Sequence, residues 1–200
     1  MKKGILNFVL VAALLVSAQN MAAQNWLNAP KSHFGIRAGI AATNTLADDW
    51  DGDYGSTDLI SPMAGIAYDT RIAKIPFYVE TGLYFLDRGQ KYKIDRNGYH
   101  HSYATTERES NFSMLVPAMI SYHAYTGKNI SIQPFMGPYL AYGFSDEEID
   151  YGWRLGCGLN IKQFYVNMGY DIGLKDDFDT HEGHVSTAFI TVGWNFLGKR

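Results

Sequence analysis

The stretch YGWRLGCGLNIKQFYVNMGYDIG, residues 151–173, decides the fold class. Within 164–173, apolar residues alternate with polar or small ones, which is the period of two of a β-strand. The same alternation runs through 153–161, and Lys162-Gln163 separates the two halves. This stretch therefore predicts an antiparallel hairpin with one apolar face and one face of glycines and polar residues.

The alternation extends over the chain from His33 onward, with turn residues between the segments. The connections are alternately short and long, and Asn97-Gly98 predicts a hairpin that protrudes as a ribbon. Bulges or irregular pairing are expected at Pro117, Pro134 and Pro138, because proline lacks the donor that a sheet ladder needs. The predicted strands are 33–43, 60–69, 76–94, 100–123, 130–144, 151–161, 164–174 and 184–197.

Two kinds of barrel have this pattern, a soluble carrier with an apolar interior and a membrane barrel with an apolar exterior. The polar face favours the second, because it is rich in glycine and poor in lysine, unlike a water-facing surface. We predict an all-β fold, a closed antiparallel transmembrane β-barrel of about eight strands with a polar, filled interior. A soluble periplasmic barrel that carries a small hydrophobic ligand is the alternative.

Charged residues of both signs fall on the predicted inner face. Buried charges persist when they are paired and hydrogen-bonded, so an interior salt-bridge network is expected, centred on Glu80 and Asp171. This network would fill the lumen and close it. The interior set is Arg37, Glu80, Arg88, Arg154 and Asp171.

The N-terminus predicts an export signal over residues 1–23. Two lysines precede an apolar stretch that is too short to span a bilayer comfortably, and cleavage fits after Ala18 or Ala23, of which we favour Ala23. Residues 24–32 would then be a short periplasmic lead-in, and residues 33–200 the barrel domain in the bacterial outer membrane.

Composition narrows the classes of partner and chemistry. Removal of the signal takes away two lysines and no acids, which moves the formal net charge from −3 to −5 and argues against nucleic acid as a partner. The single cysteine, Cys157, is expected to face lipid and has no partner for an internal disulfide. No cofactor site is predicted.

Two groups of residues are candidates for chemistry. One loop could hold a cation, although its acids are explained better as those of an ordinary solvated loop; its residues are Asp176, Asp177, Asp179, His181, Glu182 and His184. Ser121 and His123 share a strand face and suggest a lipid acyl hydrolase or acyltransferase. Residues i and i+2 lie ~6.6 Å apart along the backbone, which disfavours a hydrogen bond between them. The prediction is therefore a protein that is not an enzyme.

Four segments resemble the outer-membrane β-barrel family common in Bacteroidetes-type bacteria, whose members include PorT-like proteins. They are FGIRAGIAAT (34–43), VETGLYFLDRGQKY (79–92), PFMGPYLAYGF (134–144) and ITVGWNFLGKR (190–200). The aromatic residues Trp194 and Phe196 resemble the signal that barrel-assembly machinery recognises, although two further basic residues follow them.

The resemblance implies a fold and an assembly route, and it brings no catalytic residues with it. The expected role is envelope structure, adhesion or an accessory subunit of a larger membrane machine, and not a large diffusion pore. The expected partners are outer-membrane lipid, lipopolysaccharide, the assembly machinery, and a protein of a secretion or envelope complex.

Overall fold

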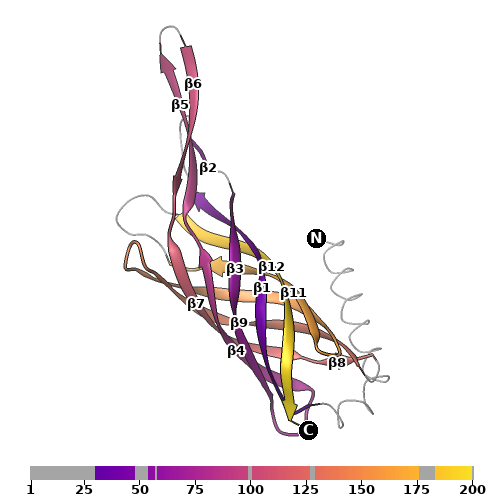
Figure 1. Ribbon diagram of the computed structural model, residues 1–200. Helices are drawn as coiled ribbons and strands as arrows, with labels where there is room; N and C mark the ends of the chain where they lie inside the picture. Colours follow the sequence, from indigo (N-terminus) through magenta and orange to yellow (C-terminus); the bar gives the residue numbers. More distant parts are fainter. Residues whose placement is uncertain are drawn as a thin grey trace, which may run out of the picture.

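The computed structural model describes residues 30–47, 54–56, 58–98, 101–126, 129–175 and 183–199. Eight long strands form the wall of an antiparallel barrel (Figure 1). They are β1 (Ser32–Ala47), β3 (Leu59–Arg71), β4 (Phe77–Asp87), β7 (Phe112–Tyr122), β9 (Ile130–Gly143), β10 (Ile149–Ile161), β11 (Phe164–Gly173) and β12 (Gly183–Lys199).

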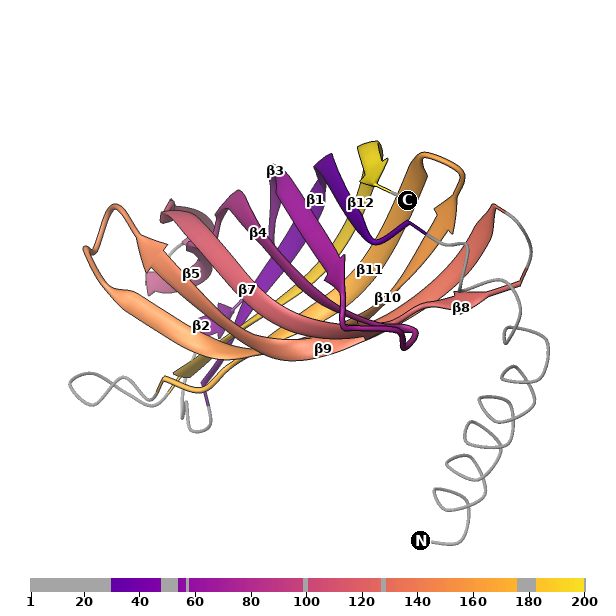
Figure 2. The ribbon, with the colours of Figure 1, turned by 90° about the horizontal axis from the view of Figure 1, so that it is seen from below.

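The barrel is closed by strand pairing all the way around. The order runs from β10 through β11, β12, β1, β3, β4 and β7 to β9, and β9 pairs with β10 to complete the ring (Figure 2). Closure leaves no wall strand with a free edge, which a sheet in a bilayer requires. The predicted fold class, a closed antiparallel β-barrel, is confirmed, and each predicted strand matches a wall strand.

Two of the predicted strands extend beyond the barrel as expected. β5 (Gln90–Gly98) and β6 (His101–Glu109) pair with each other and form a ribbon that protrudes from one end (Figure 1). A third strand, β2 (Tyr54–Ser56), pairs with β5 and was not predicted. Asn97 and Gly98 pair with Ser102 and His101, so both belong to β5, and residues 99–100 lie outside the described residues.

We call the two ends of the barrel the ribbon end and the turn end. The turn end carries the short connections 72–76, 126–129 and 162–163, and β12 finishes there (Figure 1). The ribbon and the connections 48–58, 144–148 and 174–182 lie at the ribbon end. The connection 144–148 has five residues, like 72–76 at the turn end, so the predicted alternation of short and long connections is confirmed except there.

Pairing is irregular at Pro117, as predicted, whereas Pro134 and Pro138 are in continuous register with β10. The pairing of β7 with β4 is interrupted between Ala118 and Leu115, and Pro117 lies in this gap. The Thr81 hydroxyl of β4 donates to the Pro117 carbonyl over 2.8 Å, which keeps the two strands connected. β8 (Ala124–Tyr125) continues β7 in the same register against β9 after an interruption at His123.

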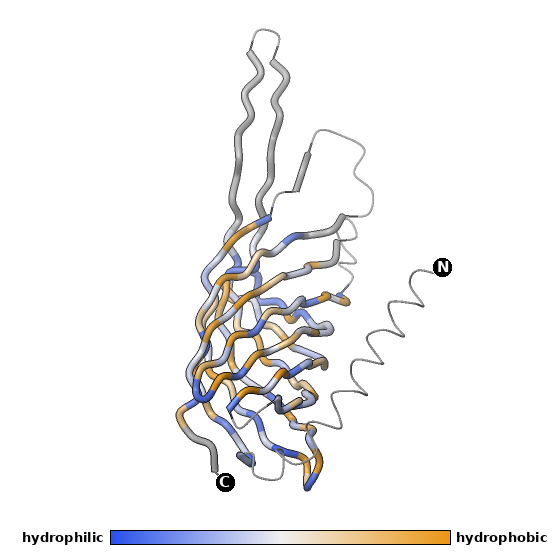
Figure 3. Tube along the Cα trace, turned by 90° about the vertical axis from the view of Figure 1, so that its right-hand side faces the viewer, coloured by the Kyte–Doolittle hydropathy of each residue, from blue (hydrophilic) through white to orange (hydrophobic). Residues whose placement is uncertain are grey.

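The apolar face of the wall points outward. In β11, Phe164 is 61% exposed and Met168 58%, whereas Tyr165 and Asn167 between them are buried. Hydropathy alternates along the strands in the same way (Figure 3). An exterior of this kind suits acyl chains and is the opposite of what a soluble carrier requires, so the lipid-facing assignment is correct.

Candidate functional site

The central feature of the lumen is an ion pair between neighbouring strands. Arg154 of β10 lies opposite Asp171 of β11, and its Nε and Nη2 atoms donate to the two carboxylate oxygens, each over 2.7 Å. Both residues are fully buried, and the guanidinium also lies over the rings of Tyr84 and Phe189. This two-bond geometry is the arrangement that holds a buried arginine and carboxylate most firmly.

The other predicted interior charges are also buried, but they have different partners. Arg37 donates through Nη2 to the Asn195 side-chain oxygen over 2.8 Å and lies over the ring of Tyr165. A Cβ atom at Gly193 would come within 2.5 Å of the Arg37 side chain, so glycine there leaves room for the arginine. Glu80 interacts electrostatically with Arg37 and Arg154 without being part of the Arg154–Asp171 pair.

Arg88 lies at the ribbon end, away from the centre of the predicted network. Its Nη1 atom donates to Asp150 over 2.6 Å and its Nη2 atom to the Tyr139 hydroxyl over 3.1 Å. Asp150, near the start of β10, supplies the carboxylate for this arginine. The predicted interior charges are therefore divided between a central group and a separate pair at the mouth.

Asp87 fixes the junction between the barrel and the ribbon, residues 88–89 and 110–111. Its Oδ1 atom accepts the backbone N–H groups of Gly89 over 3.0 Å and Asn111 over 2.8 Å, and its Oδ2 atom accepts the Ser110 hydroxyl. Ser61 of β3 donates to the Asp87 carbonyl over 2.9 Å. Asp87 was not predicted as a functional residue, although it lies where a strand continues into the predicted ribbon.

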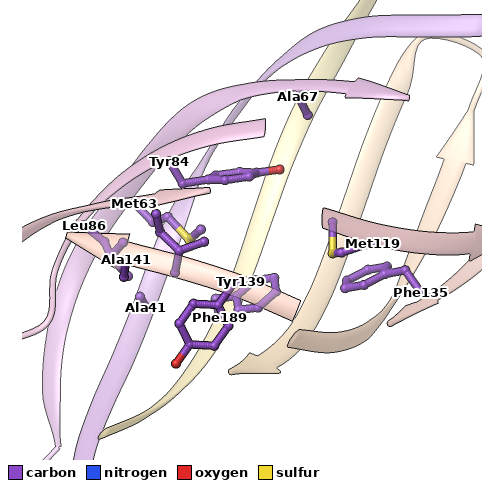
Figure 4. Packing of buried hydrophobic residues seen from close by; sticks show 11 residues of the cluster. Ala41, Met63, Ala67, Tyr84, Leu86, Met119, Phe135, Tyr139, Ala141 and Phe189 are labelled. Carbon is purple, nitrogen blue, oxygen red and sulfur yellow. The ribbon is translucent and has the colours of Figure 1, made fainter. Parts of the chain in front are cut away.

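An apolar cluster lies beside the many buried polar residues of the lumen, so the interior is mixed where a polar one was predicted. Alanine, methionine, leucine and aromatic side chains pack together within the ring of strands (Figure 4). The glycines and charges of the inner face predicted a polar interior, although large apolar residues occupy positions of the same parity. The cluster consists of Ala41, Met63, Ala67, Tyr84, Leu86, Leu115, Met119, Phe135, Tyr139, Ala141 and Phe189.

Ser121 and His123 form a hydrogen-bonded pair near the turn end. The Ser121 hydroxyl lies 3.1 Å from His123 Nε2, and Gln133 lies 3.3 Å from Nδ1 of the same ring. The expectation from backbone spacing was wrong, because the longer imidazole side chain reaches across two positions. Both residues are 0% exposed, and the Tyr78 ring stacks on His123 at 3.7 Å between centroids. A substrate has no access to this serine in the packed lumen.

A second polar pair adjoins this group. His33 and Asp69, on β1 and β3, are buried with 2.7 Å between Nδ1 and Oδ1. The Tyr78 hydroxyl donates to the carbonyl of Pro30, which lies just before β1. The alternation places these residues on the inner face, yet the contacts between strands that are distant in sequence were not predictable from it.

The candidate cation-binding loop is largely outside the described residues. Residues 176–182 are among those not described, and His184 lies at the start of β12, paired with Leu46. Among the described residues there is no group of three or more potential metal ligands. No helix in the described ranges is long and apolar enough to cross a membrane. Cys157 is exposed on the lipid-facing side, as predicted.

Comparison with protein families agrees with this architecture. A family model described as the outer membrane protein beta-barrel domain matches residues 8–196. The chain belongs to this family. Membership of this family implies a location in the bacterial outer membrane. No curated protein matches the chain.

Several solved structures are similar to this chain over most of its length. OprG of Pseudomonas aeruginosa is 12% identical with a TM-score of 0.45, over 84% of this chain and 97% of that one. Ail, the attachment invasion locus protein of Yersinia pestis, is 12% identical with a TM-score of 0.40, over 83% and 99%. Neisserial surface protein A is 11% identical with a TM-score of 0.42, over 82% and 97%.

Proposed function

We propose that this protein is a non-conducting, non-enzymatic outer-membrane barrel that presents its ribbon outside the cell in an envelope-structural or adhesive role. The packed lumen carries this proposal. An eight-stranded barrel has an interior just wide enough for side chains. Here large residues such as Arg154, Tyr84, Tyr139 and Met119 are fully buried inside it. A barrel with a filled lumen is suited to anchoring another part of the protein in the membrane.

The ribbon is the part of the protein that the barrel would anchor. The hydrogen bonds of Asp87 fix its base, and the Arg88–Asp150 pair braces the mouth beside it. A protruding element anchored in this way would keep a constant direction relative to the membrane. The turn end, with its short connections, would then face the periplasm, as is usual for outer-membrane barrels.

The assembly route and the finer family belong to the same proposal. Trp194 and the exposed Phe196 near the end of β12 support recognition by barrel-assembly machinery. The resemblance to PorT-like proteins supports an accessory role beside a secretion or envelope complex, reached from the cytoplasm through an N-terminal export signal.

Reconstitution tests the plugged lumen. We expect the purified protein in planar bilayers to produce no ion-conducting steps, because the apolar cluster and the Arg154–Asp171 pair occupy the path along the axis. A known open porin in the same bilayer serves as the positive control. Regular, reproducible channel openings would contradict the proposal.

Removal of the ribbon tests its role at the cell surface. Replacing residues 90–109 with Asn-Gly joins Gly89 to Ser110, which keeps the strand register, because a two-residue loop fits a hairpin. We expect the barrel to remain folded while cell-surface attachment or envelope integrity declines. Deletion of the connection 176–182 is the control. Unchanged attachment and unchanged sensitivity to detergent and bile salts would contradict the role assigned to the ribbon.

A further inference from the structure

The connections at the turn end carry three exposed lysines, which we call the basic rim. Lys31 precedes β1, Lys74 lies between β3 and β4, and Lys162 lies between β10 and β11. These strands belong to one continuous arc of the ring, which runs from β10 through β11, β12, β1 and β3 to β4. The Lys31 carbonyl accepts the N–H of Arg71 over 2.7 Å, which fixes the start of β1 beside the end of β3.

Exposed acids are absent from the described part of the turn end. The ranges that the structure describes there are 30–36, 68–79, 120–126, 129–132, 159–166 and 193–196, and Asp69 is the only acid among them. Asp69 is buried, and its carboxylate pairs with His33. Among the described side chains, the exposed acids lie at the ribbon end, at Asp58 and residues 146–148. The positive charge of the basic rim therefore favours an anionic partner from outside the chain.

The basic rim lies just beyond the outward-facing aromatic residues of the turn end. Phe34, Phe77 and Phe164 are 39%, 40% and 61% exposed, and such residues mark the boundary between acyl chains and headgroups. The three lysines are two or three residues further along the chain from these positions, away from the membrane centre. Three residues of a strand tilted by about 40° advance roughly 8 Å along the barrel axis. This height corresponds to the headgroup layer, which contains the lipid phosphates.

The turn at Lys162 has a backbone conformation that lysine rarely adopts. Lys162 has a φ of 59°, in the left-handed region, and glycine is the usual residue at such a position of a two-residue hairpin turn. The Lys162 N–H donates to the Asn129 carbonyl over 2.7 Å, which connects this turn to the neighbouring connection. A lysine here costs backbone energy that glycine would avoid, and strained residues of this kind cluster at functional positions. A contact made by the ammonium group would offset this cost.

We propose that the basic rim binds the headgroups of anionic phospholipids in the inner leaflet of the outer membrane. The proposal rests on the orientation given under the proposed function, with the turn end toward the periplasm, and it adds a lipid partner at the end opposite the ribbon. Lysine presents a compact point charge to a headgroup phosphate, and a cation near an anionic membrane surface is attracted to it. Because each lysine lies on a different connection, the rim would bind several lipid molecules and fix the depth of the barrel in the membrane.

Quenching of Trp194 fluorescence by brominated lipids tests the basic rim. The Trp194 ring packs edge-on against Phe164 at 4.5 Å between centroids, and Phe164 is two residues from Lys162, so Trp194 reports on the lipid beside the rim. The full-length folded protein carries W26F, W50F and W153F, which leaves this tryptophan alone. Phosphatidylcholine vesicles that contain brominated phosphatidylglycerol are compared with vesicles in which the phosphatidylcholine carries the bromine.

We expect phosphatidylglycerol to be favoured about fivefold over phosphatidylcholine beside Trp194 at low ionic strength, since one cation near an anionic surface contributes about this factor. The test variant K31Q/K74Q/K162Q should reduce the preference to less than about twofold. The matched control K91Q/K93Q/K175Q, which removes three lysines from the ribbon and the ribbon end, should keep it. The preference should also disappear at about 1 M salt, where charges are screened within about 3 Å.

Two results would overturn the proposal. Equal preference in the test variant and the parent protein would overturn the role of the three lysines, and no preference in the parent protein would overturn anionic phospholipid as the partner. Circular dichroism and resistance to detergent confirm that each variant is folded. The vesicles have the same lipids in both leaflets, so the result does not depend on the direction in which the barrel inserts. The conductance and ribbon-deletion experiments therefore test the proposed function separately.

Discussion

Replacing Asp171 with alanine should lower the free energy of unfolding by about 3–5 kcal/mol, because it leaves Arg154 buried without its carboxylate. Arg154 and Asp171 are 1% and 0% exposed, and two 2.7 Å hydrogen bonds join them. Water cannot reach the guanidinium in the packed lumen to replace these bonds. Reversible urea unfolding in phospholipid vesicles, followed by tryptophan fluorescence, measures the change.

The double variant Arg154→Met/Asp171→Leu is the matched control for this prediction. Removing both charges leaves no unpaired ion, so most of the lost stability should return, as is found when buried ion pairs are replaced by apolar residues of similar size. A single variant Asp171→Ala that loses less than about 1 kcal/mol would mean that Arg154 finds another carboxylate. Glu80, which interacts with it electrostatically, is the residue to replace next.

The Arg154–Asp171 pair illustrates what sequence can predict in a barrel of this kind. Lys162-Gln163 is a two-residue turn, so Ile161 must pair with Phe164, and counting back along both strands brings Arg154 opposite Asp171. Local alternation also assigned the lipid-facing side, because each strand carries this pattern independently of its neighbours.

The contacts that sequence could not predict lie across the lumen. Arg88, directly after the end of β4, meets Asp150 of β10, and these two strands are not neighbours in the ring. Such contacts depend on the stagger between strands around the whole barrel, which no single hairpin determines. The pairing of β2 with β5 was also not predictable from a single hairpin. The three residues of β2 belong to the connection between β1 and β3, whereas β5 belongs to the connection between β4 and β7.

The apolar cluster was missed for a different reason. Leu86, Leu115 and Met119 are at inward positions that alternation alone identifies. The inner face was inferred to be polar from its glycines and charges, but a barrel without a pore must also fill its volume, and large apolar side chains do so without needing partners. The interior is thus a mixture, in which apolar packing surrounds the few paired charges.

Replacing Ile190 with arginine should lower the free energy of unfolding by about 2–4 kcal/mol, because the charge would lie among acyl chains near the bilayer centre. Ile190 is 42% exposed and pairs with Ile40 on one side and Met168 on the other, both of which are exposed as well. Unfolding of the variant in vesicles of defined thickness measures the cost. The cost should increase in thicker bilayers, in which arginine reaches the headgroups less easily.

Ile72→Arg is the matched control, since the same chemical change is made at an exposed isoleucine in the connection between β3 and β4. This connection is at the turn end, where arginine meets headgroups or water, so the change should be about 0–1 kcal/mol. If both variants lost the same stability, the position along the barrel axis would not matter. Ile190 would then not be in contact with acyl chains, and the apolar exterior would need an occupant other than lipid.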